Sequence, residues 1–138
     1  MSPSDPLPPP PFSGIATFGR VPWRTDFSAT DVVLQGVPYD SATSNRSGAR
    51  FGPRALREHS LLLWGYNNVQ QIAPFAALTI VDGGDVPVVP PDVVATHQAI
   101  ERETRRIVEA GALPVTLGGD HSITLPLLRA VAAMAGPV

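Results

Sequence analysis

Three short runs of apolar, often β-branched residues constrain this fold more than any other feature of the sequence. They lie at residues 31–36, 78–81 and 114–117, and each is followed by a loop and then a stretch with helical character. Apolar runs of this length, without polar alternation, are typical of strands buried on both faces. Crossover connections between such strands return each helix to a face of the sheet. The sequence therefore predicts an α/β fold, a parallel sheet with helices on both faces.

Proline and serine mark two of the predicted helix starts. Pro53 is expected to open the first helix, because its missing N–H is harmless in the first turn, and this helix runs toward Leu63. The last helix is predicted over residues 123–134, with Ser122 as its cap.

The middle helix has the clearest pattern, beginning at the N-cap Asp92 and ending at Gly111. Steps of three and four residues predict one buried face for it. That face comprises Val93, His97, Ile100, Thr104 and Ile107.

The first eleven residues differ from the rest in composition. Residues 1–11 are mainly proline, serine and aspartate, which predicts an extended or disordered Pro-rich arm. A solvated tail explains such a segment better than a peptide-recognition role does. Residues 12–138 are then expected to form a single α/β unit.

Composition also excludes several classes of protein. A net charge of −2 favours neither nucleic acid nor an anionic membrane as a partner. The absence of cysteine excludes a disulfide scaffold, a Cys-based zinc site and a Cys nucleophile. No secretory signal and no apolar stretch long enough to span a membrane is present. We therefore expect a soluble, cytoplasmic protein.

Ligands of open parallel sheets gather beyond the carboxyl ends of the strands, which directs attention to three loops here. In the loop at 118–122, His121 follows two glycines at a strand end and precedes a helix. A neutral imidazole there suits a metal ligand or a general base. Asp120 and Ser122 are candidates to orient the ligand or the loop. A histidine that only caps or packs at this junction is an equally open interpretation.

The loop at 37–52 supplies glycines, polar side chains and two arginines. Asn45 and Arg46 are candidates for contact with an anionic substrate group. Subunit contacts, or a loop locked by Arg–carboxylate pairs, are the alternatives. The glycines do not form a nucleotide-binding motif.

Other polar residues carry weaker signals. His59 and His97 lie on predicted helices without paired ligands, and His97 is expected to be a satisfied core or interface histidine. Asp82 and Asp85 flank two glycines in the loop at 82–87 and suit a ligand pair, although an Asx-type turn is the commoner explanation.

Four segments, in this order, resemble the ureohydrolase family of arginases, agmatinases and guanidino-acid hydrolases. They are Gly36–Asp40, the stretch from Asn45 to Arg57, Asp82–Val86 and Gly118–Ser122. The last is the family's G-G-D-H-S signature. The resemblance implies an arginase-like three-layer α/β/α fold, incomplete here.

The same resemblance implies hydrolysis of a guanidino C–N bond, to urea and an amine, at two Mn²⁺ ions bridged by hydroxide. It implies that His121 is a ligand of one manganese. Agmatine is the first substrate expected and a guanidino acid the second, although Arg46 suits a substrate carboxylate. Homo-oligomers, trimers or hexamers, are usual in the family.

The sequence departs from the family in one large respect. The motifs D-A-H-x-D and D-x-D, which hold the family's other ligands, are absent. One histidine cannot hold two divalent cations. We therefore expect the N-terminal portion of a ureohydrolase, inactive by itself. The alternatives are a non-catalytic α/β module that binds a partner and a different α/β hydrolase that uses His121 as a base.

Overall fold

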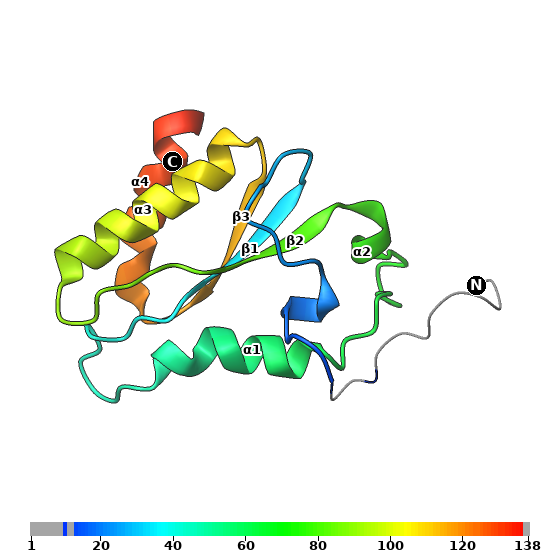
Figure 1. Ribbon diagram of the computed structural model, residues 1–138, viewed down its shortest axis with the longest axis horizontal. Helices are drawn as coiled ribbons and strands as arrows, with labels where there is room; N and C mark the ends of the chain where they lie inside the picture. The colour runs from blue at the N-terminus through cyan, green and yellow to red at the C-terminus, as the bar shows by residue number, and fades with distance from the viewer. Residues whose placement is uncertain (1–9, 11–12, 137–138) are drawn as a thin grey trace.

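A parallel sheet of three strands forms the centre of the molecule in the computed structural model, which describes residue 10 and residues 13–136. β1 (Val32–Val37) lies between β2 (Ile80–Asp85) and β3 (Leu113–Gly118). Figure 1 shows one helix below the sheet and two long helices above it. The predicted fold class is therefore confirmed. Apart from residue 10, the predicted arm lies outside the described residues.

The helices occupy the connections that the sequence predicts. One face of the sheet carries α1, and the other carries α3 with α4 packed beside it (Figure 1). Short 3₁₀ turns precede α1 and α4 directly. The α-helices are α1 (Gly52–Ser60), α2 (Pro74–Ala77), α3 (Val93–Glu109) and α4 (Thr124–Ala135), and the 3₁₀ turns are η1 (Phe18–Arg20), η2 (Ala49–Phe51) and η3 (His121–Ile123).

The central strand β1 is buried on both faces, as its apolar run predicts. Val33 and Val37 belong to the two hydrophobic clusters that the sheet forms with α3. Gln35 also points toward α3, and its amide donates to Thr104 at 2.8 Å. Gly36, on the opposite face, lies against Pro53 of α1. This alternation places α1 and α3 on opposite faces of one strand.

Two helix predictions need correction. α1 ends at Ser60 rather than near Leu63, because Leu62 and Leu63 are exposed and gain nothing from continued helical packing. In α3, Val93 is exposed and His97 only partly buried, whereas the nearby Thr96 is buried. The Thr96 hydroxyl donates to the carbonyl of Val89 and accepts from its N–H. These two hydrogen bonds hold Thr96 on the buried side of the first helical turn.

The two edges of the sheet differ. Outside β2, the segment around Trp23 forms a parallel bridge to Asp82, with backbone hydrogen bonds of 2.9 and 3.0 Å on either side of it. Outside β3, the described residues place no strand, and Leu113 and Val115 are exposed. The β3 edge is therefore open to pairing with a further strand. Within the described ranges no helix has the length and apolar character needed to cross a bilayer.

Candidate functional site at the carboxyl edge of the sheet

The loops that follow β1 and β3 meet at the carboxyl edge of the sheet. Val37 is paired with Gly118, so the two loops begin side by side. Together they line a groove of about 480 Å³. Its lining includes five of the residues that the sequence singles out: Asn45, Arg46, Asp120, His121 and Ser122.

Asp120 holds the two loops together. Its buried carboxylate accepts hydrogen bonds from the backbone N–H of Ala42 at 2.9 Å and of Ser122 at 2.9 Å. Its own N–H donates to the carbonyl of Tyr39 at 2.8 Å. Buried carboxylates are retained when they are satisfied in this way, and here the result is a fixed position for the neighbouring His121.

The predicted cap by Ser122 is wrong. The Ser122 hydroxyl donates to Asp120 at 2.5 Å, and Asp120 is the residue that caps the turn η3. α4 continues directly from that turn and has no side-chain cap of its own. The Ser122 hydroxyl is held against Asp120 by this charge-assisted hydrogen bond, and its oxygen accepts no cap hydrogen bond from the first turn of α4.

Two glycines allow the close approach of these loops. Gly119 has φ +80°, and a Cβ there would lie 2.5 Å from the carbonyl oxygen of Val37. A Cβ at Gly52 would lie 2.5 Å from the carbonyl oxygen of Gly118. Side chains at either position would separate the end of β3 from β1 or from α1.

His121 is exposed in the groove and lightly held. Its Nδ1 lies 3.4 Å from the Thr124 hydroxyl, and within the described part of the chain Nε2 has no hydrogen-bond partner. An imidazole in this state is able to bind a metal or accept a proton. The alternative, a histidine that only caps or packs at this junction, stays open beside this interpretation.

The loop after β1 is locked by an ion pair between Asp40 and Arg50. Asp40 is buried and also accepts from the backbone N–H of Gly48 at 2.5 Å. The Arg50 side chain, aided by backbone donors and opposed by burial, lowers the pKa of Asp40 to about 2. The loop-locking role proposed for an arginine in this segment therefore belongs to Arg50. Arg46 forms no ion pair with any residue that the structure describes.

The low pKa of Asp40 predicts loss of stability in acid. A carboxyl whose pKa falls from 3.8 to about 2 on folding stabilises the fold fully above its unfolded pKa, and this contribution disappears as the pH drops from about 4 to about 2. Urea unfolding of the chain and of Asp40→Asn should differ most above pH 4, and the difference should shrink below it. A difference independent of pH over this range would contradict the assignment.

Asp82 and Asp85 are not a free ligand pair, because both bind Arg57 of α1. The guanidinium donates to Asp82 at 2.8 and 2.9 Å and to Asp85 at 2.6 Å. Burial opposes the charged form of Asp82, but hydrogen bonds from Arg57 and from the N–H groups of Phe18 and Gly84 outweigh it, so the pKa of Asp82 is lowered. The Gly84 contact is the predicted Asx-type turn. Sequence analysis did not single out Arg57. The feature that could have identified it is an arginine on the buried face of a helix.

The other histidines form no metal site. His59 is exposed on α1, and His97 is partly buried in α3, where its Nε2 has no hydrogen-bond partner among the described residues. Among residues 13–136 there is no cluster of three or more His, Asp or Glu side chains able to hold a metal. The described residues therefore place no second metal-type side chain beside His121, because Asp120 is committed to the loops.

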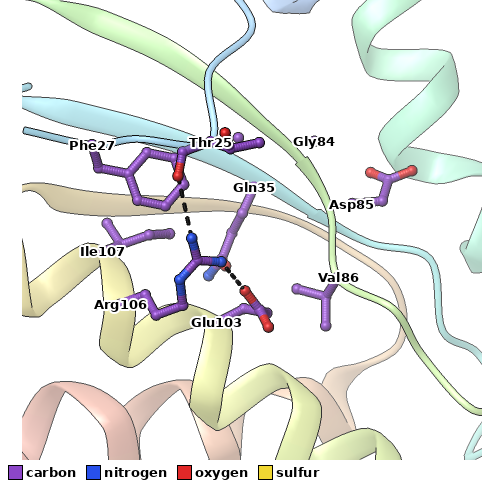
Figure 2. A pocket seen from close by; sticks show the side chains of 10 residues that line it. Thr25, Phe27, Gln35, Gly84, Asp85, Val86, Glu103, Arg106 and Ile107 are labelled. Carbon is purple, nitrogen blue, oxygen red and sulfur yellow. Dashed lines mark hydrogen bonds and ion pairs between the residues drawn. The ribbon is translucent and has the colours of Figure 1, made fainter.

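A second cavity, between the sheet and α3, is too small for a substrate. Figure 2 shows Arg106 across it, with its guanidinium 2.6 Å from Glu103 and 3.2 Å from the carbonyl of Thr25. The same group lies 5.6 Å from the centre of the Phe27 ring. The space of about 50 Å³ suits one or two water molecules, which the unpartnered Oε1 of Gln35 is able to bind.

The fold and the groove together define an α/β protein with a candidate ligand site on the loops after β1 and β3. Comparison with known proteins gives the family. The Arginase family model matches residues 30–138. Guanidinopropionase from Pseudomonas aeruginosa is 46% identical over 88% of this chain and 38% of its own length, and guanidinobutyrase from the same organism is 45% identical over 94% and 41%. The chain therefore belongs to the arginase family, and it spans about two fifths of the length of these relatives.

Solved structures agree with this assignment. Proclavaminate amidino hydrolase from Streptomyces clavuligerus superposes with a TM-score of 0.88 at 37% identity, over 94% of this chain and 43% of that one. Formiminoglutamase from Trypanosoma cruzi, solved with Mn²⁺, has a TM-score of 0.66 at 28% identity, over 75% of this chain and 35% of that one.

Proposed function

We propose that this chain carries part of the catalytic domain of a manganese-dependent ureohydrolase that acts on a guanidino acid. The observation that carries the proposal is the groove itself. An exposed imidazole, His121, stands on a loop fixed by Asp120, and Arg46 lines the same groove without an ion pair among the described residues. The groove thus presents a candidate metal ligand, His121, and a cation, Arg46, for the end of the substrate away from its guanidino group.

His121 is a suitable type of ligand for Mn²⁺, because a neutral imidazole is a good donor to this ion. It does not fit alone, because the described residues contain no group of three such ligands. The remaining ligands therefore have to come from elsewhere in the assembled enzyme. When bound, a pair of manganese ions makes water acidic enough to serve as a nucleophile near neutral pH. The contribution of Asp120 is to keep His121 in place at the carboxyl edge.

Arg46 selects the substrate in this proposal. A guanidino acid ends in a carboxylate, which forms a charge-assisted pair with a guanidinium, whereas agmatine ends in an ammonium that a guanidinium repels. The relatives named a guanidinopropionase and a guanidinobutyrase support the acid. The order of substrates expected from the sequence, agmatine first, is therefore reversed here.

A fusion of residues 1–138 to the remaining portion of the P. aeruginosa guanidinobutyrase tests the function. We expect Mn²⁺-dependent urea release from 4-guanidinobutyrate by the fusion and none by residues 1–138 alone. Arg46→Met should lower kcat/KM for 4-guanidinobutyrate by roughly 10- to 100-fold, the value of a hydrogen bond to a charged group, and leave agmatine turnover unchanged or raised.

The control is Arg102→Met on α3, which changes the same charge away from the groove and should affect neither substrate. A fusion that folds and binds manganese but releases no urea from either substrate would contradict the proposed function. Equal losses for both substrates in Arg46→Met would contradict only the role of Arg46.

A further inference from the structure

The loop between β1 and α1 closes on itself at Asp40. This buried carboxylate accepts hydrogen bonds from the backbone N–H of Gly48 at 2.5 Å and of Arg50 at 3.3 Å, and it pairs with the Arg50 guanidinium. The Asp40 carbonyl also accepts from the Thr43 hydroxyl at 2.9 Å. One residue thus joins the beginning of the loop to its end, and residues 41–47 lie in the closed ring between these points.

Other parts of the fold hold the same loop at both sides. Near its start, Asp120 accepts from the backbone N–H of Ala42 at 2.9 Å, which ties the loop to the segment that carries His121. At its end, the loop runs directly into the turn η2 and the helix α1. The backbone of this loop is therefore attached to β1, to the loop after β3 and to α1.

Arg46 lies in the part of the loop that Asp40 closes. It is exposed and lines the groove, and it forms no ion pair with any described residue, so the backbone that carries it sets its position. Misplacing a substrate-binding group by about 1 Å costs as much as about 100-fold in rate. Asp40 and Arg50 do not line the groove themselves, so an effect of their ion pair on substrate has to pass through the loop.

We infer that Asp40 and Arg50 are positioning residues for substrate selection, because their ion pair fixes the loop that presents Arg46 to the groove. This inference rests on the proposed function, in which Arg46 binds the carboxylate of a guanidino acid. A loop that is ordered before binding loses little conformational entropy when the substrate arrives. The ion pair should therefore lower the KM for the guanidino acid and leave kcat nearly unchanged. Agmatine has no carboxylate for Arg46, so its turnover should not depend on the pair.

Trypsin cleavage of the 138-residue chain after Arg46 tests the loop without any measurement of activity. Cleavage at this bond requires local opening, so its rate follows the population of the open loop. Arg50→Met should raise that rate at least about tenfold, the value of a hydrogen bond to a charged group. Cleavage after Arg106, within α3, reports general unfolding and should not change.

Arg50→Lys repeats the trypsin test with less disturbance of the fold. Lysine keeps the positive charge beside Asp40 but lacks the fork of donors, so cleavage after Arg46 should accelerate by a smaller factor. The inference is overturned if cleavage after Arg46 is unchanged in both variants. It is also overturned if, in both, this cleavage accelerates no more than cleavage after Arg106 does.

Kinetics of the fusion enzyme described above test the selection itself. Arg50→Met should raise the KM for 4-guanidinobutyrate roughly tenfold and change kcat, manganese content and agmatine turnover by less than about twofold. If Arg50 acts through Arg46, the same substitution in an Arg46→Met background should have almost no further effect. The control is Arg54→Met, because Arg54 pairs with Glu58 on α1 and does not line the groove.

The outcomes separate this inference from the proposed function. A fusion that releases no urea from either substrate contradicts the proposed function and the selective role together, whatever the trypsin test shows. An active fusion in which Arg50→Met impairs both substrates equally overturns the positioning role alone. So does an active fusion in which the losses from Arg46→Met and Arg50→Met are additive.

Discussion

Arg57→Met is expected to lower the free energy of unfolding by about 3–5 kcal/mol, the usual consequence of removing one partner of a buried ion pair. Arg57 joins α1 to the end of β2 through Asp82 and Asp85. Methionine occupies similar space but leaves the carboxylate of Asp82, only 1% exposed, without its counter-charge. Equilibrium urea unfolding, followed by circular dichroism, measures the loss.

Arg54→Met is the matched control on the same helix. Arg54 also forms an ion pair, with Glu58 at 3.0 Å, but its side chain is 83% exposed. Exposed pairs of this kind contribute about 0–1 kcal/mol, so the control should unfold close to the wild-type midpoint. Similar losses in the two variants would show that the ion pairs of Arg57 are not what holds α1 to the sheet.

His121→Ala in the fusion enzyme is expected to remove one manganese per subunit and to lower turnover at least about 100-fold. Altering residues that merely support metal ligands costs 10- to 100-fold, so losing a ligand should cost more. Asp120 keeps the loop in place without the imidazole, because its hydrogen bonds to Ala42 and Ser122 do not involve His121. Elemental analysis and urea release at saturating Mn²⁺ measure the two effects separately.

His59→Ala provides the histidine control. His59 is exposed on α1 and does not line the groove, so its loss should change neither metal content nor rate. If His121→Ala retains both metals and the wild-type rate, then His121 is a structural residue, and the metal assignment made here is wrong.

Local patterns were sufficient to predict the architecture. The apolar run of β1 predicted a strand buried on both faces, and the structure places α1 on one side of it and α3 on the other. Parallel strands place their carboxyl ends at one edge, so the meeting of Arg46 and His121 followed from strand order alone. Helix ends and faces were less predictable. Thr96 is buried through its contacts with Val89, and no pattern within α3 reports those contacts.

The sequence by itself therefore determined the order of elements, the parallel sheet and the edge at which the candidate site lies, because hydrophobic periodicity and strand direction are properties of the chain. Only the tertiary structure decided how the charges pair. Asp82 and Asp85 face Arg57, 25 residues or more away, because α1 lies across the end of β2. The structure also left Trp64 and its neighbours exposed, since an apolar sequence does not specify whether its own fold will cover it. Pairing and exposure depend on which segments meet in space, and distant parts of the chain decide that together.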